Sequence, residues 1–71
     1  MVTANYERVA ADLRRRIRTG ELQPGDKLPS TRELQNQYGV GNNAVHMAMV
    51  LLKAEGLVEG HQGKGVYVTG A

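Results

Sequence analysis

Three polar side chains that can hydrogen-bond to nucleic-acid bases lie close together in the middle of the chain, at Asn42, Asn43 and His46. They follow a Gly39-Val40-Gly41 turn. Small donors and acceptors on the first turns of an exposed helix are what a protein needs in order to read base edges in a DNA groove. Whether they can do so depends on the elements that hold them.

The segment before the turn is predicted to be a helix over residues 31–38. Ser30 and Glu33 have the spacing of a capping box, in which the hydroxyl accepts from the third N–H and the carboxylate reaches back to the cap. Leu34 and Tyr38 give this helix an apolar face, and Gly39 supplies the left-handed residue that ends it.

A second helix is predicted over residues 42–55, with Gly41 as its cap. One face of it is apolar at i, i+3, i+4 and i+7, through Val45, Ala48, Met49 and Leu52. Asn42, Asn43 and His46 then point outward. A helix-turn-helix places such a helix in the major groove. The alternative is a common helical hairpin with a solvated face.

The N-terminal part of the chain predicts a helix over residues 4–19, capped by Thr3 and ended by Gly20. Its apolar stripe consists of Tyr6, Val9, Ala10, Leu13 and Ile17. The segment Gln23-Pro24-Gly25-Asp26 has the pattern of a type II turn, and Leu28 can form one short strand pairing before Pro29.

The C-terminal part predicts a β-hairpin, or wing, over residues 57–69. Its two β-prone runs, 57–59 and 66–68, flank the glycine-rich tip 60–65. At the tip, Lys64 can meet a phosphate, and His61 or Gln62 can reach a minor-groove edge. The tip does not have the spacing of a phosphate-binding loop, because no Ser or Thr and no helix follows Lys64.

Length and composition limit the possible classes. The 71 residues allow a single domain, 1–71, too small for a large catalytic cavity. There is no cysteine, and the two histidines lack a metal-binding spacing, so we expect no cofactor, no metal site and no enzyme activity. No apolar run is long enough to span a membrane, so we expect a soluble, cytoplasmic protein.

Positive charge is concentrated at the start of the chain, although the net charge is only +2. Residues 1–20 hold five arginines against Glu7 and Asp12, whereas residues 21–71 have a small excess of carboxylates. This distribution is compatible with binding to a polyanion. The simpler interpretation of the arginines at 14–18 is a solvated helix face, with cations near the helix C-terminus, and direct contact with phosphates is the alternative.

The complete pattern resembles the N-terminal DNA-binding domain of the GntR family of bacterial transcription regulators. The resemblance rests on the motifs in 20–34 (GEL-x-PGDKLPS-x-REL), 38–40 (YGV), 55–58 (EGLV) and 63–68 (GKG-x-YV). It implies a mainly α fold with a small β-hairpin, a winged helix-turn-helix, that binds a palindromic operator in double-stranded DNA as a homodimer. The DNA-binding positions that it implies are Ser30, Thr31, Arg32, Gly41, Asn42, Asn43, Ala44, His46, Gln62, Gly63 and Lys64.

Three positions depart from the family pattern. Members often carry Ser-Arg in place of Gly41-Asn42, and an arginine in place of His46. An arginine fork matches guanine, whereas an asparagine amide matches adenine, so we expect an operator less dependent on guanine. YtrA-like or HutC-like subfamilies are candidates. The alternative is that Asn42 and Asn43 only satisfy the helix N-terminus.

A second apolar stripe lies roughly opposite the core stripe of the same helix, where the family is more often polar. It comprises Met47, Val50, Leu51 and Ala54. We expect it to form a dimer or interdomain interface, or else to be covered by the first helix or the wing.

The leading interpretation is a sequence-specific DNA-binding transcription regulator, a repressor that acts as a dimer. The alternative is a winged-helix module for protein–protein interaction without DNA readout. A small-molecule effector is expected only if a further domain exists.

Overall fold

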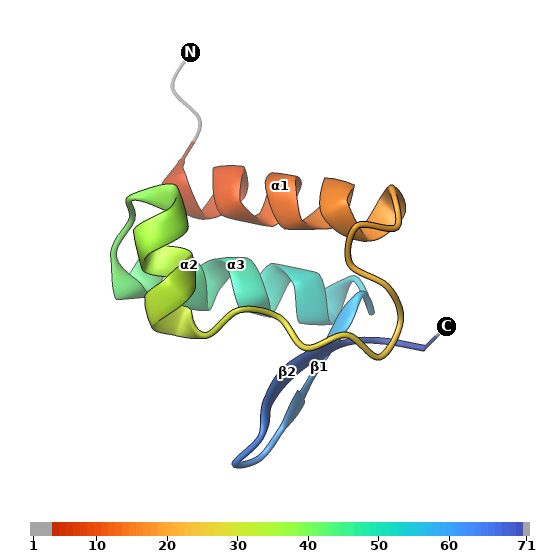
Figure 1. Ribbon diagram of the computed structural model, residues 1–71. Helices are drawn as coiled ribbons and strands as arrows, with labels where there is room; N and C mark the ends of the chain where they lie inside the picture. The colour runs from red at the N-terminus through yellow and green to blue at the C-terminus, as the bar shows by residue number, and fades with distance from the viewer. Residues whose placement is uncertain (1–3, 71) are drawn as a thin grey trace.

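The computed structural model describes residues 4–70, which contain three helices and a two-stranded hairpin. In chain order these are α1 (Asn5–Arg18), α2 (Thr31–Tyr38), α3 (Asn42–Ala54), β1 (Val58–His61) and β2 (Gly65–Val68). The fold is the mainly α winged helix-turn-helix that the sequence predicts (Figure 1). The predicted cap of the first helix is wrong, because the N-cap is Ala4 without a side-chain hydrogen bond. Thr3 lies outside the described residues.

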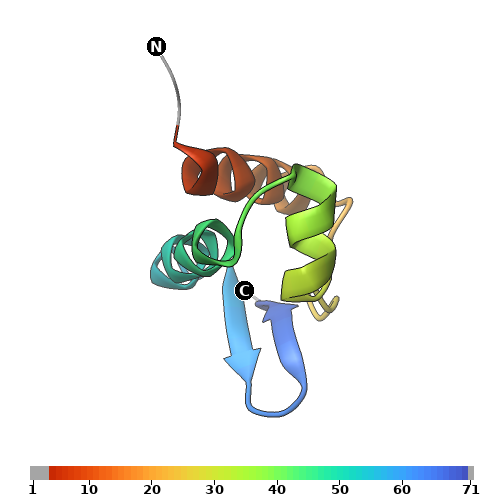
Figure 2. The same ribbon diagram turned by 90° about the vertical axis from the view of Figure 1, so that its left-hand side faces the viewer.

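The core lies between α1 and α3, which run side by side in both views (Figures 1 and 2). The two predicted core stripes meet there: Val9, Ala10 and Leu13 of α1 are buried. The predicted core face of α3 is buried as well, and Leu34 of α2 closes the third side. Since α3 buries this whole face, its opposite face is left toward solvent.

The turn between α2 and α3 has the geometry that the sequence predicts. The Ser30 hydroxyl accepts from the Glu33 N–H at 3.1 Å, and the Glu33 carboxylate accepts from the Ser30 N–H at 3.0 Å. Gly39 ends α2 in the left-handed conformation, with φ +64°. The Val40 N–H then donates to the Gln35 carbonyl, and the half-buried Val40 side chain packs on the core.

The hairpin is antiparallel and pairs Val58 with Val68 and His61 with Gly65. Its strands are longer than predicted, so the tip shrinks to the turn 62–64. A third segment joins β2: Lys27 pairs with Tyr67, and the Leu28 N–H donates to the Val66 carbonyl at 2.8 Å. The short strand predicted at Leu28 is therefore present, and it ties the loop after α1 to the hairpin.

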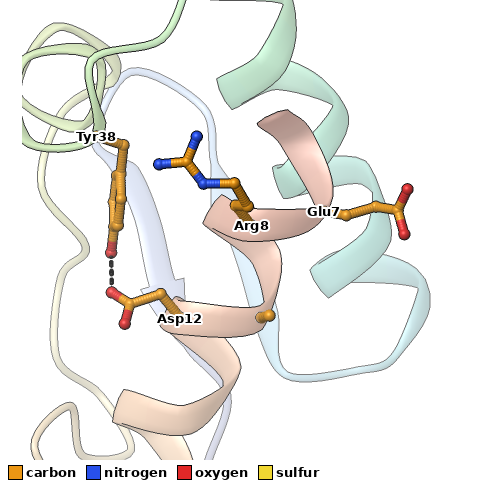
Figure 3. A pocket seen from close by; sticks show the side chains of 5 residues that line it. Glu7, Arg8, Asp12 and Tyr38 are labelled. Atoms are coloured by element: carbon orange, nitrogen blue, oxygen red, sulfur yellow. Dashed lines mark hydrogen bonds between the residues drawn. The ribbon is translucent and has the colours of Figure 1, made fainter. Parts of the chain in front are cut away.

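An ion pair and a hydrogen bond hold α1 to the two other helices. Arg14 donates to both carboxylate oxygens of Glu55, at 2.7 and 2.5 Å, and so links α1 to the end of α3. Asp12 accepts from Arg15 at 2.6 Å and from the Tyr38 hydroxyl at 2.5 Å, which links α1 to the end of α2 (Figure 3). These arginines hold carboxylates of the same chain, so the predicted solvated face of α1 is only partly present.

These contacts make the pKa of three carboxyl groups lower than usual. The Tyr38 hydroxyl and then Arg15 lower the pKa of Asp12, the Ser30 N–H lowers that of Glu33, and Arg14 lowers that of Glu55. A carboxyl group whose pKa is lower in the folded state than in the unfolded state stabilises the fold fully at pH values above the unfolded-state pKa. This stabilisation is lost as the pH falls through the folded-state pKa.

We therefore expect the free energy of unfolding to be constant near neutral pH and to fall below about pH 4, where unfolded carboxyl groups take up protons. Urea unfolding as a function of pH measures this. The variant Asp12→Asn should show a shallower acid loss. Glu7→Gln is the matched control on the same helix, because Glu7 points away from Asp12 and Tyr38 (Figure 3). Equal acid profiles for the two variants would contradict the assignment.

Candidate nucleic-acid interface

The outward face of α3 begins with the polar side chains that the sequence singled out. Asn42, Asn43 and His46 are exposed, whereas Ala44 is half-buried. Val45 and Ala48, on the other side of the same helix, are fully buried. The hydrophobic core thus fixes the rotation of α3 about its axis, and with it the direction in which the polar side chains point.

The N-terminus of α3 is not capped by a side chain within the described residues. Its N-cap is Gly41 in an extended conformation, with φ −83° and ψ 173°. The alternative role for Asn42 and Asn43, in which they satisfy the helix N-terminus, is therefore not seen. Backbone N–H groups at such a terminus also favour a phosphate or another anion.

The start of α2 supplies three of the predicted positions, Ser30, Thr31 and Arg32, all of which are exposed. The Ser30 hydroxyl is committed to the capping box. Arg32 follows in the first turn of α2, and no carboxylate pairs with it within residues 4–70. Its guanidinium can therefore meet a phosphate without first breaking an internal ion pair.

The hairpin turn holds the last three predicted positions, Gln62, Gly63 and Lys64, which are also exposed. Gly63 has φ +76°, and the Lys64 N–H donates to the His61 carbonyl at 2.9 Å. His61 belongs to β1, where its ring lies 3.1 Å from a Glu59 oxygen and edge-on to Tyr67. Its position at the strand end corrects the prediction that it belongs to the loose tip.

The start of α2 and the hairpin lie on the side of the molecule away from α1, and the turn 62–64 is at the end of the hairpin that projects away from the helices (Figures 1 and 2). A hollow there is lined by Ser30 and Thr31 at the start of α2, by Met49 on the core side of α3 and by Gly65 and Val66 of β2. The predicted residues at the start of α2 thus lie close to β2, whereas the outward side chains of α3 and the turn 62–64 do not line this hollow. We call this side the α3 surface: residues 30–32, the outward side chains of α3, and residues 62–64.

Positive charge on this surface is less neutralised than on α1. Arg14, Arg15 and Arg16 of α1 form ion pairs with Glu55, Asp12 and Glu21. Within residues 4–70 no such pair involves Arg32, Lys64, Lys27 or Lys53. Arg8 and Arg18 of α1 also form no ion pair within these residues, so the free cations that a polyanion needs are found around α3 and the hairpin as well as on α1.

Lys27 and Lys53 are functional candidates that the sequence analysis missed. Each extends along the hairpin, since a Cβ added to Gly65 would lie 2.8 Å from Lys27 Cε and one added to Gly60 would lie 3.3 Å from Lys53 Nζ. Gly60 and Gly65 were predicted to belong to the tip, and only the structure places them in β1 and β2, where a glycine marks such a close approach. With Lys64, these lysines place three cations along the hairpin.

Three further features of the described residues concern other kinds of site. In the hollow beside Arg8, Asp12 and Tyr38, two of the lining side chains are joined by the hydrogen bond from Tyr38 to Asp12 (Figure 3). No three His, Cys, Asp or Glu side chains of residues 4–70 are grouped as a metal site would need, and no helix there is long and apolar enough to cross a membrane.

An outward-facing helix, held by a preceding helix through a short turn and flanked by a β-hairpin, defines a winged helix-turn-helix DNA-binding domain. Residues 5–68 match the family described as "Bacterial regulatory proteins, gntR family". The chain belongs to this family of transcription regulators, as the sequence motifs indicated.

Relatives and solved structures agree with this assignment. The chain is 43% identical to the Uxu operon regulator of Haemophilus influenzae over 68 residues, which cover 96% of this chain and 26% of that protein. It is 36% identical to the transcriptional repressor YtrA of Bacillus subtilis, over 94% of this chain and 52% of that one. The DNA-binding domain of AraR in complex with operator ORR3 superimposes with a TM-score of 0.93, at 29% identity, over 97% of this chain and 83% of that chain.

The chain spans about a quarter of the length of the Uxu operon regulator and about half that of YtrA. The similarity therefore concerns the DNA-binding region of these regulators.

The left-handed turn residue gives a test of how the α3 surface is positioned. We expect Gly39→Ala to lower the free energy of unfolding by roughly 1–2 kcal/mol, because a Cβ is unfavourable at φ +64°. Gly41→Ala is the matched control, since Gly41 has a negative φ and open space around it. Urea unfolding of the two variants measures the difference, and equal losses would show that the turn is not under this constraint.

Proposed function

We propose that this chain binds operator DNA in a sequence-specific manner, with α3 in the major groove. The observation that carries the proposal is the α3 surface itself: the amides at Asn42 and Asn43 are exposed, and so are the cations at Arg32 and Lys64 on the neighbouring helix and hairpin. Cations that hold phosphates beside a helix fix its position, and the amides of the helix then distinguish base edges.

The side chains on α3 favour adenine over guanine. An asparagine amide pairs with the N6 and N7 groups of adenine, whereas His46 supplies a weaker contact. No arginine is present in α3 to match guanine. We therefore infer that the half-site contains A·T pairs beneath the first two turns of α3.

The names of the relatives support a role in repression. NagR and YtrA of Bacillus subtilis and MngR of Escherichia coli are named as repressors. Repression by this chain would follow from occupancy of an operator that overlaps a promoter.

The relatives are transcription regulators rather than enzymes, and a small-molecule effector would require a domain beyond residues 1–71.

Selection of bound duplexes from a random pool by residues 1–71 tests DNA recognition directly. We expect an A·T-containing half-site to be enriched. We expect Arg32→Ala to weaken binding to that half-site about tenfold and to reduce the dependence of affinity on salt by one phosphate contact.

Arg18→Ala is the matched control for this measurement. It removes the same charge from an exposed position at the end of α1, near Glu55 and thus away from the start of α3. Equal effects of the two substitutions would indicate only a general attraction between charges. Failure to enrich any sequence would reject sequence-specific binding and favour the protein-interaction module.

We further propose that two copies act together on a palindromic operator. One copy offers a single α3 and so reads one half-site, and joining two copies makes the second binding event intramolecular. A tandem of two chains on a flexible linker should bind a duplex with two half-sites about 10²- to 10⁴-fold more tightly than one chain does. A duplex with one half-site should show little gain, and an equal gain on both duplexes would contradict paired recognition.

A further inference from the structure

Two apolar side chains lie in the middle of the polar outward face of α3. Met47 and Val50 are 44% and 46% exposed, and they are the large hydrophobic residues left exposed in the described part of the chain. Exposed apolar side chains beside polar ones commonly mark a contact with another molecule.

Their spacing places them on the surface proposed to enter the groove. Asn43, His46, Met47 and Val50 stand at i, i+3, i+4 and i+7, so they share one face of the helix. Homeodomains read the major groove with side chains at this same spacing on their third helix. Met47 and Val50 therefore continue the face that Asn43 begins.

The other members of the predicted apolar stripe do not extend this patch. Leu51 is half-buried and packs on the core, beside Ala10 and Arg14 of α1. Ala54 is exposed but offers only a methyl group. Two half-exposed side chains fall far short of the roughly 800 Å² per partner that a stable protein interface buries. A second copy of this chain is therefore a poor fit to Met47 and Val50.

We propose that Met47 and Val50 contact the C5-methyl groups of thymines in the major groove of the half-site. This inference rests on the proposed function and specifies its base readout. An A·T pair presents the adenine N6/N7 edge and the thymine methyl group side by side in the same groove. An amide at Asn43 and apolar side chains along the same face match both features of such a pair.

The neutrality of this part of α3 supports the assignment. From Asn42 to Leu52 the helix contains no lysine, arginine, aspartate or glutamate. A neutral, partly apolar face gains little from phosphates but gains from methyl groups removed from water. Burial of one methyl group changes an equilibrium constant by about fourfold, which is the effect expected for each contact.

Replacement of thymine by deoxyuridine tests this directly, because it removes only the methyl group and leaves the hydrogen-bonding groups of the base pair intact. The probe is the half-site selected by residues 1–71, with each thymine replaced in turn. We expect the wild-type chain to bind about fourfold more weakly at one or two positions. Met47→Ala or Val50→Ala should bind the thymine and deoxyuridine duplexes equally at the position that each side chain contacts.

Lys64→Ala is the control, since loss of a phosphate contact should weaken binding to both duplexes by the same factor. Uniform insensitivity of the wild-type chain to deoxyuridine, or a selected half-site without thymine, would overturn the proposal while leaving DNA binding intact. Ala variants that retain the full deoxyuridine effect would also overturn the proposal. Ala variants that lower the molecular mass in solution would overturn it too, because they would indicate a subunit interface. Failure to select any half-site would refute the proposed function itself.

Discussion

Burial of one face of α3 against α1 is the interaction on which the rest of the structure depends. Val45, Ala48 and Leu52 are fully buried there, so α3 cannot rotate about its axis without exposing them to water. The bidentate bond from Arg14 to Glu55 holds the far end of α3 to α1, and Gly39 sets the turn into its near end. The direction of every outward side chain on α3 follows from this arrangement.

The same packing explains where the charges lie. Four arginines in the second half of α1 would repel one another if none were neutralised, and three of them are held by carboxylates from the helix itself, the following loop and α3. The carboxylates used in this way leave Lys27, Arg32, Lys53 and Lys64 without internal partners in residues 4–70. A chain with a net charge of only +2 can thus offer a locally positive surface.

Local patterns were sufficient to predict most of the fold. The capping box at Ser30, the left-handed Gly39 and the two core stripes depend on neighbours within a turn or two, so the sequence shows them directly. Contacts between distant segments could not be predicted in this way. The bond from Tyr38 to Asp12, and the lysines lying along Gly60 and Gly65, join residues far apart in the chain. The two apolar residues Met47 and Leu51 looked equivalent by periodicity, yet only packing shows that one is exposed and the other half-buried.

In the proposed complex, affinity and specificity come from different parts of the α3 surface. The cations at Arg32 and along the hairpin belong to elements that contact α3, and phosphate contacts bind all sequences alike. The helix from Asn42 to Leu52 contains no lysine, arginine, aspartate or glutamate, so it adds little to non-specific binding. Its amides and apolar side chains contribute to the binding free energy only where a base pair supplies matching groups. Because the recognition helix is neutral and the segments next to it are basic, salt should change the affinity of the domain for DNA while leaving its sequence specificity largely unaltered.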